Sequence, residues 1–128
     1  VYAVECDPDA CALIRKNREK FRAYNLTLIE SRAPEALAGL PAPDAVFVGG
    51  TKGGMDGVLG AIYCKNPDAR VCISAIALET LSTAVAALTA RGLTAEVTQI
   101  AVSRTRPAGR LHLLTANNPI FLITGTRK

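Results

Sequence analysis

Apolar and polar positions alternate along this chain in two patterns, one typical of β-strands and one typical of helices. Short runs of consecutive apolar residues, bounded by polar or turn-forming residues, have the length of buried strands. These runs lie at residues 1–4, 26–29, 45–48, 70–76, 93–102 and 120–124. Between most of them, apolar residues recur every three or four positions, which predicts amphipathic helices.

Three helices are predicted in this way. The first begins at Asp7, a favourable N-cap that is followed by Pro8, a favourable first helical residue. The sequence APEAL at 33–37 predicts one further turn of helix, and Gly92 is expected to end the last helix. The apolar positions expected to face the core are Ala10, Leu13, Ile14 and Phe21, then Met55, Val58, Leu59 and Ile62, then Leu78, Leu81, Val85 and Leu88.

The order of these elements predicts an α/β fold in one domain, residues 1–128. Alternating strands and helices form a doubly wound, Rossmann-like, mostly parallel sheet with helices on both faces, which is a three-layer arrangement. The last two strands have no helix between them and are expected to pair antiparallel at one edge. The basic segment that joins them shows no helical pattern and is expected to be a long connection.

Composition excludes several classes of protein. Apolar residues make up 49% of the chain and charged residues 20%, which excludes disorder. The longest nearly apolar stretch, VCISAIAL, is far shorter than the roughly 20 residues that cross a bilayer. The net charge is +4, and the charges are unevenly distributed: Glu5, Asp7 and Asp9 lie near the start, whereas the last quarter of the chain carries a basic cluster of Arg104, Arg106, Arg110, His112, Arg127 and Lys128. This cluster is either a solvated face or a site for an acidic ligand, and the lack of aromatic residues within it disfavours nucleic acid.

The cysteines and the single histidine provide no recognisable catalytic or metal site. Cys6, Cys11, Cys64 and Cys72 show no CxxC spacing, and His112 has no serine or cysteine at a triad position. No metal is therefore expected. Cys6 and Cys72 lie in apolar runs and are expected to be buried thiols, a usage that fits the cytoplasm.

Three features fall at the carboxyl ends of predicted strands, where α/β folds bind their ligands. They are Glu5, the turn at 31–33, and the glycine-rich loop at 49–54. An acid at a strand end can accept hydrogen bonds from both hydroxyls of a ribose. The other interpretation of Glu5, a solvated acid near a helix start, remains open at this stage.

A strand-end acid of this kind normally follows another strand and a glycine-rich turn, so the chain is expected to begin one βα unit late. The missing strand would lie between residues 1–4 and 45–48. Its absence would leave a gap of about two strand spacings, roughly 10 Å.

Together these segments resemble a known family. VYAVECDPDACALIRKN, ESRAPEAL, PDAVFVGGTKGG, VCISAIALETL and NNPIFLITG are similar, over nearly the whole chain, to the decarboxylating precorrin-6Y methyltransferases of cobalamin biosynthesis. The resemblance implies a class I methyltransferase domain that uses S-adenosylmethionine, with an antiparallel last strand pair. It also implies C-methylation of a tetrapyrrole precorrin coupled to loss of an acetate carboxyl.

The resemblance also implies roles for individual positions. Glu5 would bind the ribose hydroxyls, Arg32 and Ala33 would flank the adenine, and Gly49 and Gly50 would line the methionine end. Cys6 and Asp7 would lie beside the adenosine. Thr51, Gly53 and Ser74 would contact the substrate. Because such a substrate carries many carboxylates, the clustered Arg104, Arg106 and Arg110 are expected to bind them as a clamp. The sequence departs from the family at Ser74, where an asparagine is expected, and in the glycine-rich turn, which lies outside this chain.

Two other functions fit parts of the pattern. An NAD-dependent oxidoreductase domain would share the strand-end acid, and a non-catalytic α/β module could act through its basic edge. The expected partners are a precorrin substrate and further copies of the chain, with a second methyltransferase domain fused to it or working with it. Neither nucleic acid nor a membrane is expected as a partner.

Overall fold

The computed structural model describes residues 1–51 and 53–127. Its helices are α1 (Pro8–Lys20), α2 (Met55–Lys65) and α3 (Leu78–Thr89), with a short 3-10 helix, η1 (Glu35–Leu37). Its strands are β1 (Tyr2–Glu5), β2 (Thr27–Glu30), β3 (Ala45–Val48), β4 (Arg70–Ala75), β5 (Thr94–Ile100), β6 (Ser103–Ala108), β7 (Leu111–Ala116) and β8 (Ile120–Thr126). The six predicted strands are all present, with their ends within two residues of the expected positions.

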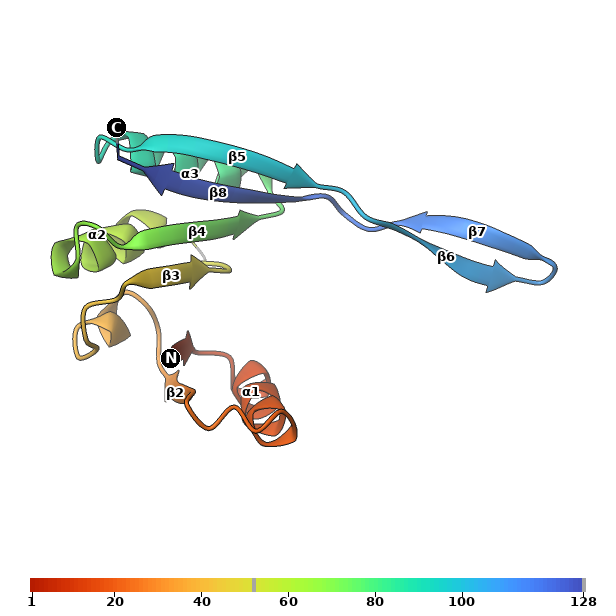
Figure 1. Cartoon of the computed structure of the whole chain (residues 1–128), viewed down its shortest axis with the longest axis horizontal. Coiled ribbons are helices and arrows are strands. Elements are labelled where there is room, and N and C mark those ends of the chain that lie inside the picture. The colour runs from red at the N-terminus through yellow and green to blue at the C-terminus, as the bar shows by residue number, and fades with distance from the viewer. Residues whose placement is uncertain (52, 128) are drawn as a thin grey trace.

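The described strands form two separate sheets and a protruding hairpin (Figure 1). The larger sheet has the order β3-β4-β8-β5, and the smaller consists of β1 paired parallel with β2. β3 and β4 are parallel, whereas β8 runs antiparallel to both of its neighbours. The predicted antiparallel pair of β5 and β8 is therefore confirmed, and β5 forms the outer edge.

The hydrophobic core lies between the larger sheet and the helices α2 and α3. Leu59 of α2, Leu88 of α3, Ile73 of β4 and Ile123 of β8 are fully buried there. The predicted apolar stripe of α2 is confirmed, because its four members are the buried residues of that helix. Gly125 of β8 belongs to the same packing: a Cβ there would lie 2.9 Å from a methyl group of Leu88.

Helix α1 begins as predicted but packs differently. The Asp7 carboxylate accepts hydrogen bonds from the backbone N–H groups of Asp9 and Ala10, which caps the helix. The predicted core positions Leu13 and Phe21 are exposed, because α1 packs against the two-stranded sheet and not against the main core. The cysteine expectation is also wrong in part: Cys6 is exposed, whereas Cys11 on α1 is buried.

The segment expected to be a long connection is instead a β-hairpin of β6 and β7. Its two-residue loop is Gly109-Arg110, and Gly109 has φ +62°, as the first position of a tight hairpin turn favours. The signal was present in RTRPAGRLHLLTA as alternation around a Gly-X pair. The hairpin projects well away from the rest of the molecule (Figure 1).

Candidate functional site

A cavity of about 890 Å³ lies between the smaller sheet and the edge of the larger one. Val1, Tyr2 and Val4 line one side of it, and residues 45–48 of β3 line the other. Neither β1 nor β3 has a hydrogen-bonded strand on the side that faces the cavity, among the strands described. The gap predicted between these two strands is therefore confirmed.

Four of the predicted cofactor or substrate positions line this cavity: Ala33, Gly49, Gly50 and Thr51. They come from two loops that are distant in sequence, the turn after β2 and the loop after β3. The packing of Pro34 against α2 brings these loops together, since a Cβ on Gly57 would lie 3.3 Å from the Pro34 ring. Sequence analysis did not predict this contact. The signal in the sequence is Gly57 near the start of α2, because a glycine inside a helix can mark a close approach by another segment.

Glu5 ends β1, and its carboxylate is held by the backbone that follows. Its Oε1 accepts hydrogen bonds from the N–H groups of Cys6, at 2.7 Å, and Asp7, at 2.8 Å. In the described residues Oε2 has no such partner, so one oxygen fixes the orientation while the other can accept from a ligand. Glu5 itself does not line the cavity, although Val4 next to it does.

A second carboxylate lies directly opposite Glu5. Glu30 ends β2 in register with Glu5, and like charges at paired positions destabilise a sheet. Arg15 of α1 forms an ion pair with Glu30 and offsets this repulsion. Burial raises the pKa of the neighbouring Cys11 thiol, and the charges of Glu30 and Glu5 raise it further. This thiol is therefore protonated, and it donates a hydrogen bond to the Glu5 carbonyl oxygen at 3.5 Å.

The glycine-rich loop is held by one contact with β4 and by one hydrogen bond within the loop itself. On the side of β3, the Ser74 hydroxyl donates to the carbonyl oxygen of Gly49 at 3.5 Å. At the start of α2, the Thr51 carbonyl oxygen accepts from the N–H of Gly54, which closes a turn, and Gly53 has φ +94°. Ser74 therefore contacts the loop, and Gly53 is part of it. Neither residue lines the cavity.

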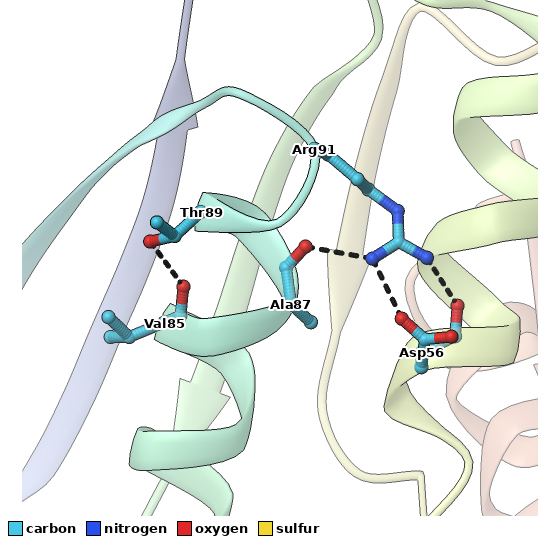
Figure 2. Close-up of polar contacts among 5 residues, drawn as sticks. All are labelled: Asp56, Val85, Ala87, Thr89 and Arg91. Atoms are coloured by element: carbon cyan, nitrogen blue, oxygen red, sulfur yellow. Dashed lines mark hydrogen bonds and ion pairs between the residues drawn. The ribbon is translucent and has the colours of Figure 1, made fainter.

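Arg91 fixes the first turn of α2, just beyond this loop, to the end of α3 (Figure 2). One of its terminal nitrogens contacts the Asp56 carboxylate at 2.8 Å and donates to the Ala87 carbonyl oxygen at 2.8 Å. The other donates to the carbonyl oxygen of Asp56 at 2.9 Å. Sequence analysis did not identify this contact, because Arg91 and Asp56 are 35 residues apart.

Other predicted site residues lie away from the cavity. Cys6 and Asp7 are exposed beside Glu5, and Arg32 is exposed next to Ala33. Arg104 and Arg106 lie on β6, and Arg110 lies in its turn, so the hairpin carries all three away from this cavity. Among the described residues, no group of three or more His, Cys, Asp or Glu side chains is placed to hold a metal ion. None of the described helices is long and apolar enough to span a membrane.

Comparison with known proteins identifies the family. A family profile described as a precorrin methyltransferase domain matches residues 1–127. The chain belongs to this family. The precorrin methyltransferase domain therefore extends over almost every residue of the chain.

Relatives of this precorrin methyltransferase domain agree with the match. A protein of Pyrobaculum calidifontis, named a probable cobalt-precorrin-6B C(15)-methyltransferase (decarboxylating), is 40% identical over 97% of this chain and 64% of its own length. The crystal structure of precorrin-6y C5,15-methyltransferase from Geobacter metallireducens matches with a TM-score of 0.91 and 34% identity. That match covers 99% of this chain and 66% of the other.

A crystal structure described as a precorrin 8W decarboxylase, from Methanobacterium thermoautotrophicum, matches with a TM-score of 0.92 and 33% identity. It covers 98% of this chain and 69% of the other. These structures confirm the α/β methyltransferase fold. The chain spans about two thirds of the length of the relatives it matches. The relatives described above support the methyltransferase and not the NAD-dependent oxidoreductase or the non-catalytic module.

Proposed function

We propose that this domain takes part in the S-adenosylmethionine-dependent C-methylation of a precorrin macrocycle, coupled to loss of an acetate carboxyl as carbon dioxide. The observation that carries the proposal is that β1, Ala33 in the turn after β2, and Gly49–Gly50 all line one cavity, in a chain of this family. The place of this reaction would be cobalamin biosynthesis in the cytoplasm.

The residues around the cavity fit S-adenosylmethionine. The part of the cavity that would hold it is the end formed by Ala33, Gly49 and Gly50, at the carboxyl ends of β2 and β3. Oε2 of Glu5 would accept from the ribose hydroxyls, because Oε1 is already held by the backbone. Arg32 and Ala33 would flank the adenine, with Cys6 and Asp7 beside the adenosine, and Gly49 and Gly50 would allow the methionine end to approach the backbone.

When bound, S-adenosylmethionine supplies a methyl group on a positively charged sulfur. The role of the protein is then mainly to hold the accepting carbon in line with that methyl group. Alignment of this kind can lower a barrier by roughly 7–11 kcal/mol. Because alignment is the main contribution, this proposal needs no nucleophilic side chain. Thr51, Gly53 and Ser74, in or beside the glycine-rich loop, would face the substrate.

We also propose how the domain is completed. A parallel strand between β1 and β3 would pair with both free edges and join the two sheets into one. The relatives are longer than this chain, and a segment equivalent to their additional residues would supply such a strand. It would occupy part of the present cavity, and a glycine-rich turn at its end would meet the methionine portion of the cofactor.

The expected binding of substrate carboxylates by the three arginines would require a second copy of the chain or a second domain. Arg104, Arg106 and Arg110 could bind substrate carboxylates only if the hairpin reaches a site other than the cavity described here. A homo-oligomer would allow this, as would a second methyltransferase domain that works with this one. Both remain proposals.

The test is binding of S-adenosylhomocysteine by isothermal titration calorimetry. Loss of charge-assisted hydrogen bonds worth about 1.5–3 kcal/mol should weaken binding to Glu5→Ala roughly 10- to 150-fold. Glu5→Gln keeps an acceptor for the Cys6 and Asp7 N–H groups and separates loss of charge from loss of the local turn. Glu96→Ala, an exposed acid on β5, is the control and should bind as the unmodified protein does.

Two results would contradict the proposal. Unchanged affinity in both Glu5 variants would remove Glu5 from the site. Absence of saturable binding to the unmodified protein would overturn the cofactor assignment for this chain.

A further inference from the structure

Two glycines lie inside helix α2, and they differ in what surrounds them. Gly57 and Gly60 each occupy a position where glycine destabilises a helix relative to alanine. A Cβ on Gly60 would meet the Arg91 guanidinium at 3.5 Å, an ordinary contact with the end of a flexible side chain. A Cβ on Gly57 would lie 3.3 Å from the Cγ atom of Pro34, closer than side chains normally approach. Only Gly57 therefore permits an approach that alanine would obstruct.

Gly57 lies between the two loops assigned to the cofactor. Pro34 directly follows Ala33, which lines the cavity. On its other side, Gly57 is the third residue after Gly54, the N-cap of α2 and the end of the glycine-rich loop. The same turn of helix thus continues from the glycine-rich loop and contacts the turn that carries Ala33.

A clash at this position would displace the turn and not the helix. Residues 58–59 are buried in the core, and Asp56 is tied to α3 by Arg91. Pro34, in contrast, is only half-buried and lies in a turn. Because a close-packed interior resists displacement, the exposed partner of a new contact yields first. A side chain at Gly57 would therefore push the turn away from α2.

The rest of the connection between β2 and β3 is attached to the same helix. The Lys65 ammonium donates to the carbonyl oxygen of Ala38 at 2.8 Å and to that of Leu40. Asn66, the C-cap of α2, donates from its side-chain amide to the carbonyl oxygen of Pro43 at 2.8 Å. These contacts hold the later part of the connection in place. A shift at its start is therefore confined to the turn beside the cofactor site.

We propose that Gly57 is a positioning residue that sets the separation of the two cofactor loops across the cavity. Without a side chain at this position, the turn after β2 packs directly on α2, where Ala33 and Gly49–Gly50 can contact one molecule of S-adenosylmethionine. Gly57 does not line the cavity, and it acts through Pro34. The inference rests on the proposed function, because it concerns the same site.

The test compares Gly57→Ala with Gly60→Ala, which make the same change in the same helix. Alanine favours a helix at both positions, so both variants should fold, as circular dichroism would verify. Gly60→Ala should raise the urea midpoint of unfolding and should bind S-adenosylhomocysteine, measured by isothermal titration calorimetry, as the unmodified protein does. Gly57→Ala should weaken this binding roughly 3- to 10-fold, because a shift of the turn by a few tenths of an ångström removes part of its contact with the ligand.

Pro34→Ala separates positioning from a general loss of packing. This change removes Cγ, the atom closest to a Cβ at position 57. In the Pro34→Ala background, Gly57→Ala should therefore weaken binding less than about 2-fold further, since the two residues are in contact and their effects are coupled. Two losses with separate origins would instead add in free energy.

Three results would refute the role of Gly57 alone. They are equal binding by Gly57→Ala and the unmodified protein, an equal loss in Gly60→Ala, and the same loss from Gly57→Ala with or without Pro34→Ala. Absence of binding by the unmodified protein would refute the cofactor assignment, and this inference with it.

Discussion

Arg91 permits a quantitative test of how α2 and α3 are held together. Its guanidinium makes three contacts: the Asp56 carboxylate, the Asp56 carbonyl and the Ala87 carbonyl (Figure 2). The Arg91 side chain is 22% exposed, whereas that of Asp56 is 81% exposed. The ion pair is therefore solvent-screened and worth about 0–1 kcal/mol. Each carbonyl hydrogen bond contributes about 0.5–1.5 kcal/mol.

These magnitudes separate two variants. Arg91→Ala removes all three contacts and should lower the free energy of unfolding by about 1–4 kcal/mol. Asp56→Ala removes only the carboxylate, since the backbone carbonyl stays, and should cost about 1 kcal/mol or less. High salt should reduce the cost of Asp56→Ala and leave most of that of Arg91→Ala.

Urea unfolding at neutral pH, followed by circular dichroism, measures both effects. Arg127 is the matched control because it also combines a carboxylate, Asp68, with a carbonyl, Pro67, but is more exposed. Arg127→Ala should therefore cost less than Arg91→Ala. If Asp56→Ala costs as much as Arg91→Ala, the two carbonyl bonds contribute nothing and the argument fails.

Two further predictions concern buried groups. The Tyr63 hydroxyl is buried without a hydrogen-bond partner in the described protein, and burial raises its pKa. Tyr63→Phe should therefore leave stability unchanged or raise it by about 1 kcal/mol, measured by urea unfolding, and a loss of 2 kcal/mol or more would contradict this. The raised pKa of Cys11 disfavours its thiolate in the folded state. The free energy of unfolding that this shift contributes should be fully present below the unfolded thiol pKa of about 8.5 and should decline as the pH rises above it. Cys11→Ala should flatten the decline of stability between about pH 8 and about pH 10, and an unchanged slope would refute the assignment.

Local sequence signals predicted most of the elements because each signal acts over a few residues. Asp7 caps α1, and the stripe from Met55 to Ile62 forms the buried side of α2. The hairpin of β6 and β7 was missed, although its turn and alternation were present. It was missed because basic residues occupy alternate positions of β6 and neither face of the hairpin is buried. The alternation of apolar and polar residues that identifies a half-buried strand is therefore weak.

The candidate site was predictable in part. Strand-end positions predicted the convergence of Ala33, Gly49 and Gly50, because parallel strands end at the same edge of a sheet. The direction of the Glu5 carboxylate was not predicted although it is set locally, by the backbone N–H groups of the next two residues. The position of Arg104, Arg106 and Arg110 was not predicted because these residues lie on a hairpin that projects away from the cavity.

The sequence by itself determined the type and order of the elements, and the edge at which a ligand could bind. These follow from hydrophobic period, capping and turn chemistry, all of which are local. Only the tertiary structure decided which apolar residues are buried and which polar groups meet. Leu13 and Phe21 have the helical spacing of core residues yet are exposed, since burial depends on a second surface that covers them. Arg91 and Asp56 meet because two helices pack side by side, which no local pattern encodes.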